Sequence, residues 1–199
     1  MDNIFCEIFS LIEKDKINSK EEFDDFISNL TNHPTPVREA CAYKLDEFYD
    51  DKYLDDNSAN IILDSITDIN PNISRMVCKV INSNKQLQEA LVEKLIEKIN
   101  KILNDFSYKE RIQNNKSHAK NKALFSLYWL LEALFYCYRE EFYSDEILKI
   151  LNATISFSDY TIREKTAQLL TKIKNPPERI IEQIKQDNNF YVNFYTKFL

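Results

Sequence analysis

Glycine is absent from all 199 residues of this sequence, although a protein of this length and average composition would contain about 14. Glycine provides the positive φ angles or the close backbone approach on which phosphate-binding loops, dinucleotide-binding turns, nucleophile elbows and Asn-Gly hairpins depend. None of these motifs is present in its usual form. The missing residue type therefore excludes the usual active-site architectures of many enzymes.

Cysteine and histidine are scarce as well. The four cysteines are Cys6, Cys41, Cys78 and Cys137. They form no C-x-x-C pair, and their apolar or helical contexts predict buried free thiols in a reducing compartment. The two histidines, His33 and His118, lie in a turn and among lysines, so we expect both at the surface. With no H-E-x-x-H motif and no Cys/His cluster, the sequence predicts neither a metal site nor a cofactor.

Long apolar runs are also missing. The longest, over 123–138, is interrupted by Glu132 and is too short to cross a bilayer, so it predicts a helix covered on most sides. The first residues lack the basic and apolar regions of a signal peptide. With 44% apolar and 29% charged residues, we expect a cytoplasmic protein without membrane association, forming a single domain over 1–199.

The dominant pattern is helical. Apolar residues recur every three or four positions along nearly the whole chain, and strand-like alternation is almost absent. Ser19 and Glu22 form a capping box at the start of one stretch, and Pro34 and Pro71 introduce two others. The spacing predicts about eleven helices joined by short turns, and therefore an all-α fold.

A short motif recurs within these helices. The segment Val37-Arg38-Glu39, with Ala42 and Leu45, matches Ile162-Arg163-Glu164, with Ala167 and Leu170. Ile73, Cys78 and Ile81 keep the same spacing, although Arg75 lies one position later than the motif requires. A turn followed by this Val-Arg pattern, a small residue and a Leu resembles the second helix of a HEAT repeat.

The resemblance implies a right-handed α-solenoid of about five HEAT-like helix pairs, an armadillo-like helical fold, with an irregular helical bundle as the alternative. In HEAT repeats the Val and Leu of the motif enter the core, and its Arg braces adjacent repeats through neighbouring acids. Arg38 and Arg163 are therefore expected to be structural. The helix over 2–13 lies outside any detected repeat and is expected to cap the solenoid.

No catalytic constellation accompanies the repeats. Some HEAT-like proteins are alkyl-purine DNA glycosylases that use tryptophans near a carboxylate, but the single tryptophan, Trp129, is followed four residues later by Ala133. We expect Trp129 in the core. The sequence favours a non-enzymatic protein that acts as a protein–protein interaction scaffold or adaptor.

Negative charge is concentrated in the first third of the chain. Residues 1–70 contain 17 acidic and 6 basic side chains, whereas residues 71–199 contain 15 acidic and 20 basic ones. The predicted partner-binding residues are Glu39, Asp46, Glu47, Asp50 and Asp51. Asp46 and Asp50 are expected on one side of a helix over 36–50, with few lysines nearby, as steering of a basic partner would require. An inhibitor of a basic toxin or nuclease, and a merely solvated surface, are the alternatives.

Positive charge gathers around a polar stretch over 107–117. Its members are Lys94, Lys98, Lys101, Lys109, Arg111, Lys116, Lys120 and Lys122. This segment supports the alternative of a nucleic-acid-associated protein, either glycosylase-like or RNA-binding. The net charge of −6 and the scarcity of aromatic residues among these lysines favour a protein partner.

Overall fold

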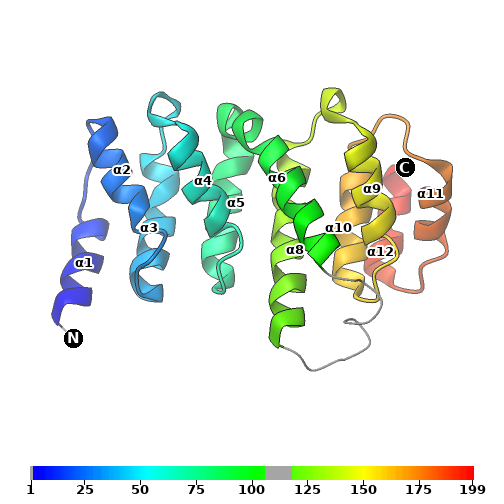
Figure 1. The fold of residues 1–199 in the computed structure, drawn as a ribbon, viewed down its shortest axis with the longest axis horizontal. Helices are drawn as coiled ribbons and strands as arrows, with labels where there is room; N and C mark the ends of the chain where they lie inside the picture. The colour runs from blue at the N-terminus through cyan, green and yellow to red at the C-terminus, as the bar shows by residue number, and fades with distance from the viewer. Residues whose placement is uncertain (1, 106–117) are drawn as a thin grey trace. The chain divides into compact units, whose positions relative to one another are not determined.

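The computed structural model describes residues 2–105 and 118–199, and within them it contains eleven α-helices, three short 3-10 helices and no strand (Figure 1). The prediction of an all-α fold is confirmed. The chain forms two compact units, Met1–Leu91 (unit 1) and Val92–Leu199 (unit 2). The expectation of a single domain over 1–199 stays a prediction.

Unit 1 arranges its helices in two layers. It contains α1 (Asp2–Ile12), α2 (Lys20–Ser28), α3 (Thr35–Phe48), η1 (Asp51–Tyr53), α4 (Asp56–Ser65), α5 (Pro71–Ser83) and the start of α6 (Lys85–Asp105). Helix α3 packs between α1 and α5, and α2 packs against α4 (Figure 1). Alternate helices thus share a layer, so α3 and α5 present neighbouring surfaces to solvent.

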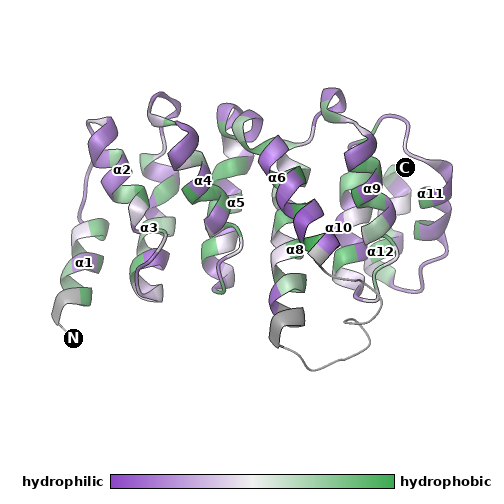
Figure 2. Cartoon of the chain, in the orientation of Figure 1, coloured by the Kyte–Doolittle hydropathy of each residue, from purple (hydrophilic) through white to green (hydrophobic). Residues whose placement is uncertain are grey.

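Unit 2 repeats this alternation. After the rest of α6 it contains α8 (His118–Cys137), η2 (Glu140–Phe142), α9 (Asp145–Thr154), α10 (Tyr160–Leu170), α11 (Glu178–Lys185), α12 (Phe190–Phe194) and η3 (Tyr195–Phe198). Helix α10 packs against α8, α9 and α12. Most helices of both units carry apolar and polar residues together (Figure 2), as expected where one face is buried and the other is solvated.

Three helical hairpins, α2–α3, α4–α5 and α9–α10, have the same internal spacing. Their N-cap residues, whose side chains accept a backbone N–H of the first turn, are Ser19, Asp55 and Ser144. The first buried residue of the second helix follows 18 positions later, at Val37, Ile73 and Ile162 (19 to 37, 55 to 73, 144 to 162). The equal spacing gives the recurring sequence motif a structural counterpart.

The correspondence between the units extends beyond one hairpin. A shift of 89 residues (73 to 162) takes α3, η1, α4 and α5 to α8, η2, α9 and α10 in the same order. Tyr49 and Tyr138 each donate a hydrogen bond to a carboxylate two residues later, at 2.9 and 3.5 Å. The buried hydroxyls of Ser65 and Thr154 each donate to the carbonyl four residues earlier, at 2.8 and 2.7 Å. Unit 2 therefore repeats the local structure of unit 1 in detail.

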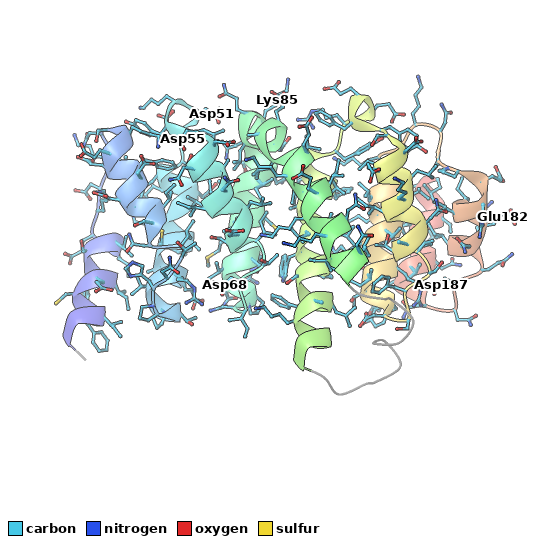
Figure 3. The ribbon with its side chains drawn as sticks, viewed as in Figure 1. Asp51, Asp55, Asp68, Lys85, Glu182 and Asp187 are labelled. Atoms are coloured by element: carbon cyan, nitrogen blue, oxygen red, sulfur yellow. The ribbon has the colours of Figure 1, made fainter. Side chains whose placement is uncertain are left out.

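Two arginines tie successive hairpins together. Arg38 of α3 donates from Nε and Nη2 to the two carboxylate oxygens of Asp68, at 2.7 and 3.2 Å. Arg163 of α10 does the same to Asp187, at 2.6 and 3.1 Å. Both carboxylates, labelled in Figure 3, are 9% exposed, and each also accepts the backbone N–H two residues later at 2.8 Å. The expectation that both arginines brace neighbouring hairpins is confirmed.

Side-chain caps start several helices of this glycine-free chain. Asn70, Asp159 and Asn189 each accept the backbone N–H two residues later, at 2.9 Å, and so start α5, α10 and α12. Among the described residues only Asn32 has a positive φ, of 58°. Asparagine tolerates this left-handed conformation better than other residues with a Cβ atom.

The expectation of four buried thiols is wrong for Cys6. This residue is exposed on α1, whereas Cys41, Cys78 and Cys137 are buried. Its apolar neighbours on the outer side of α1 are themselves exposed, so the apolar context did not indicate burial. Burial raises the pKa of Cys137 to about 12, which keeps that thiol protonated and unreactive.

Trp129 is half-buried and does not lie in the core as expected. Its ring stands edge-to-face with Phe125 and Tyr128, with centroids 6.3 and 5.2 Å away. The reason is that the fully buried side of α8 is formed by other residues, Leu127, Leu130, Leu131 and Leu134. Phe125, Tyr128 and Trp129 therefore lie on the partly covered side of α8.

Candidate functional site

The exposed side of α3 and α5 carries an open groove of about 410 Å³. The residues that line it, called the α3–α5 groove below, are Ala42, Tyr43, Asp46, Glu47, Met76 and Lys79. The Tyr43 side chain is 69% exposed, while Val37, Cys41 and Leu45 bury the opposite side of α3. Helical periodicity therefore fixes the core side of α3 and turns Tyr43 toward solvent.

Two of the predicted partner-binding residues, Asp46 and Glu47, lie in this groove. Lys79 Nζ is 2.6 Å from Asp46, and Lys44 Nζ is 2.6 Å from Glu47. The expectation of few nearby lysines is therefore wrong, because α5 brings Lys79 across from α3. The Lys79 side chain is 68% exposed, so its ion pair with Asp46 contributes at most about 1 kcal/mol and a partner's cation replaces it at little cost, whereas the Lys44 side chain is only 13% exposed.

Glu39 lies at one end of α3 and is engaged in local structure. Its two carboxylate oxygens accept hydrogen bonds from the side-chain amides of Asn70 and Asn72, at 3.1 and 2.8 Å. These contacts join α3 to the start of α5. Glu39 therefore supports the packing that forms the groove rather than lining it.

Asp50 and Asp51 lie apart from the groove, at the start of η1. Helix α3 ends at Phe48, and Asp50 caps η1 by accepting the backbone N–H of Lys52 at 3.1 Å. Hydrogen bonds from the side chain and then the backbone of Lys52 hold the pKa of Asp50 below its usual range. The expectation that Asp46 and Asp50 share one side of a helix over 36–50 is wrong, because the helix stops between them.

The five predicted residues thus occupy three places. Figure 3 shows Asp51 and Asp68 at opposite ends of the helices of unit 1, and Glu39 contacts the turn that follows Asp68. Only Asp46 and Glu47 meet in the groove. Sequence reasoning missed Tyr43, although its position opposite the buried stripe of α3 was a usable signal.

In unit 2 the equivalent face, between α8 and α10, is closed by side chains. A shift of 89 takes Tyr43 and Met76 to Glu132 and Lys165, whose Oε2 and Nζ atoms are 2.5 Å apart. The two side chains are only 13% and 10% exposed. Tyr136 Oη also donates to Glu132, at 2.7 Å. The one charged residue of the apolar run over 123–138 is therefore a member of a buried ion pair.

This ion pair keeps its lysine protonated. Burial by itself would lower the pKa of Lys165, but the hydrogen bond and charge of Glu132 outweigh burial, and the pKa is raised. The ammonium also contacts Gln168 at 3.0 Å and lies 4.9 Å from the centre of the Tyr128 ring. A lysine held in this state is neither a nucleophile nor a general base. The face between α8 and α10 has the chemistry of a structural contact.

The basic candidate region is only partly described. Lys94, Lys98 and Lys101 lie on α6, and Lys122 lies on α8. The side chain of Lys120 and the whole of Lys109, Arg111 and Lys116 lie outside the described residues. Lys101 shares a surface hollow of about 520 Å³ with Glu97 and Glu146. Two carboxylates beside one lysine oppose binding of a phosphate backbone at this hollow.

The described ranges contain neither a metal-binding cluster nor a membrane-spanning helix. Across 2–105 and 118–199, no three His, Cys, Asp or Glu side chains are arranged to hold a metal ion. The helices in those ranges include none with the length and apolar character needed to cross a bilayer. His33 is half-buried, with Nδ1 3.7 Å from Glu7, and the side chain of His118 lies outside the description.

Comparison with known proteins assigns no family. No protein-family model matches the sequence, and no curated protein matches it. An engineered protein of known crystal structure has 10% sequence identity, with 91% of this chain and 82% of that chain covered and a TM-score of 0.43. Similarity at that level assigns neither fold nor function.

Proposed function

We propose that this chain is a non-enzymatic α-solenoid of the HEAT type, with about five helix pairs, that binds another protein at the α3–α5 groove. The equal hairpins and the bracing by Arg38 and Arg163 support the repeat architecture, because in a solenoid each hairpin packs on the next. The observation that carries the binding role is Tyr43, which stands 69% exposed in a groove that also contains two carboxylates.

The groove has the chemistry of a docking site for a basic protein. Tyrosine is among the residues that contribute most to protein interfaces, because its ring is large and rigid while its hydroxyl stays polar. A partner's lysine or arginine placed over the Tyr43 ring gains a cation–π contact beside Asp46 and Glu47. Unit 1 has 18 acidic and 9 basic residues, a net charge of −9, which steers such a partner toward it.

A basic toxin or nuclease inhibited by this acidic unit is one partner of this class, and a basic scaffolding partner is another. The buried thiols of Cys41 and Cys137, which form no disulfide, support a reducing compartment, and therefore the cytoplasm as the place where the two proteins meet.

Affinity capture with a matched pair of variants tests the proposal. The groove variant combines Tyr43→Ala, Asp46→Asn and Glu47→Gln, and the control variant combines Tyr143→Ala, Glu141→Gln and Asp145→Asn at an exposed site of unit 2. Mass spectrometry of native lysate captures should show a protein retained by the wild type and the control but lost by the groove variant. Equal capture by all three proteins, with helicity unchanged by circular dichroism, contradicts the groove as the site.

Association kinetics then separate contact from steering. With the captured partner, Asp46→Asn with Glu47→Gln should raise the dissociation rate and slow association. Asp50→Asn with Asp51→Asn should only slow association and flatten its dependence on salt, because these residues lie at the start of η1 and not in the groove. Identical kinetics for both double variants and the wild type would leave solubility as the role of these acids.

A further inference from the structure

Helix α1 has an apolar outer face that the described residues of unit 1 leave largely exposed. The helix packs against α3 and buries Leu11. Phe5, Phe9 and Ile12 nevertheless remain 49% to 61% exposed. Their spacing of four and three residues places them in one stripe, about two helical turns long. A solenoid cap is expected to have a polar outer face, so α1 differs from the cap predicted over 2–13.

The last elements of unit 2 have a face of the same kind. Val192 of α12 is buried, and α12 packs against α10. Phe190, Phe194 and Phe198, each four residues from the next, remain 39% to 71% exposed. Neighbouring rings in this series have centroids 6.3 and 5.6 Å apart, so the three form a continuous ribbon.

We propose that a second copy of this chain covers these faces, with the α1 stripe of one copy packed on the ribbon of α12 and η3 of the next. On their inner sides α1 and α12 each pack against the neighbouring helix of the same layer, α3 and α10. Each outer face is therefore the place where a further helix of that layer would pack. Burial of the six side chains supplies the driving force, and the α3–α5 groove takes no part.

Charge selects the head-to-tail arrangement over the two symmetric ones. Residues 1–13 contain three acidic residues and no basic one, and residues 188–199 contain Lys197 and no acidic one. The Lys197 ammonium lies 5.0 Å from the centre of the Phe194 ring, directly at the ribbon. Pairing two α1 helices, or two ribbons, brings like charges together, whereas pairing α1 with the ribbon brings opposite charges together. Contacts between different faces continue into open chains unless they close into a ring.

Sedimentation velocity with complementary variants tests this arrangement. The head variant carries Phe5→Ser with Phe9→Ser, and the tail variant carries Phe190→Ser with Phe198→Ser. The wild type should form species larger than a dimer as its concentration rises, and each variant alone should stay monomeric. An equimolar mixture of the two variants should form a dimer and stop there, because only one intact head and one intact tail remain to pair.

Two single substitutions complete the experiment. Ile69→Ser removes an exposed apolar side chain from the turn before α5 and should leave wild-type association unchanged, and Lys197→Glu should weaken association by no more than about fivefold. Circular dichroism checks that every variant is folded. A wild type that stays monomeric at every concentration, a head or tail variant that dimerises alone, or a mixture that stays monomeric overturns the proposal.

Discussion

The outer faces of α3–α5 and α8–α10 are built on corresponding positions, yet the first is open and the second is filled. Tyr43 and Met76 border a groove in unit 1, while their counterparts 89 residues later, Glu132 and Lys165, meet at 2.5 Å. The same hairpin geometry therefore supports two opposite surface designs. The difference lies in exposure, because the ion pair across α8 and α10 is only 10% to 13% exposed, whereas Asp46 and Lys79, which pair across α3 and α5, are 39% and 68% exposed.

The flanking positions differ in the same sense. Asp46 and Glu47 correspond to Phe135 and Tyr136 in unit 2, so carboxylates are replaced by aromatic rings. The Lys172 ammonium lies 4.5 Å from the centre of the Phe135 ring, and Tyr136 donates to the buried acid. In unit 2, Phe135 and Tyr136 make internal contacts that stabilise the fold. In unit 1 the Asp46 and Glu47 side chains stay 39% and 52% exposed despite their ion pairs with Lys79 and Lys44, so a partner can reach them.

The largest predicted effect comes from breaking the filled face. Glu132→Ala should lower the free energy of unfolding by about 3–5 kcal/mol, because Lys165 is left buried without its counter-charge. Tyr43→Ala, at the corresponding position of unit 1, should lower it by no more than about 0.5 kcal/mol because the residue is exposed. Urea unfolding followed by circular dichroism measures both.

A double variant distinguishes charge from packing at the same site. Glu132→Leu combined with Lys165→Met removes both charges, reproduces Met76 at the second position, and should recover most of the stability lost in Glu132→Ala. If the double variant is as unstable as the single one, the filled face depends on its hydrogen bonds with Tyr136 and Gln168 more than on the avoidance of an unpaired charge.

The next effect concerns the braces, where the two units are alike. Arg38→Ala and Arg163→Ala should each lower the free energy of unfolding by about 1–3 kcal/mol, because Asp68 or Asp187 loses its partner while largely buried. Arg163→Lys should restore only part of the loss, since lysine cannot bond both carboxylate oxygens in the same planar geometry.

Binding gives the brace variants a second readout. Partner capture by Arg163→Ala should match the wild type at a temperature where the variant is fully folded. Loss of capture under that condition would place Arg163 in the binding surface instead. A change in unfolding free energy below about 0.5 kcal/mol in either alanine variant would show that the braces add little stability.

The smallest predicted effect is a difference in how the N-caps Asp55 and Ser144 contribute to stability at low pH. Hydrogen bonds from the backbone of Ser58, and then from Lys20, lower the pKa of Asp55 from 3.8 to about 2. A lowered pKa means that the carboxylate stabilises the folded state above its unfolded pKa, and that this contribution disappears as the pH falls through the folded value. The corresponding cap of unit 2, Ser144, has no charge to lose.

Asp55→Ser, which copies Ser144, measures this difference. The wild type should exceed the variant by less than about 1 kcal/mol near neutral pH, because the carboxylate is nearly half exposed and screened by solvent. The excess should vanish as the pH is lowered from about 4 to about 2. A difference that is independent of pH would show that the cap acts through geometry alone. Urea unfolding at several pH values provides the measurement.

Local spacing predicted what depends on local structure. The helical class follows from periodicity, and the equal hairpins follow from the motif at Val37 and Ile162. The Arg38 and Arg163 braces followed only from the resemblance to HEAT repeats, because their acids lie in the next turn of the fold. The end of α3 was misplaced because the side chain of Asp50 caps η1 and stops the helix two residues early.

Contacts across the layers could not be predicted in the same way. The ion pairs Asp46–Lys79 and Glu132–Lys165 each join residues 33 positions apart, on successive helices of one layer. Their formation depends on how two hairpins are rotated against each other, which the spacing within one helix does not determine. The candidate groove was therefore found only in part, through its two acids and without Tyr43.

The turns that close without glycine affect the unfolded chain as well as the folded one. Every residue has a Cβ atom, so the unfolded ensemble samples fewer backbone conformations than that of a protein with ordinary glycine content. Each hairpin consequently gives up less backbone entropy when its caps form. Asn32, with its φ of 58°, is the one described residue whose backbone lies outside the negative-φ conformations that residues with a Cβ atom prefer. The restricted backbone of the unfolded chain therefore favours the folded state.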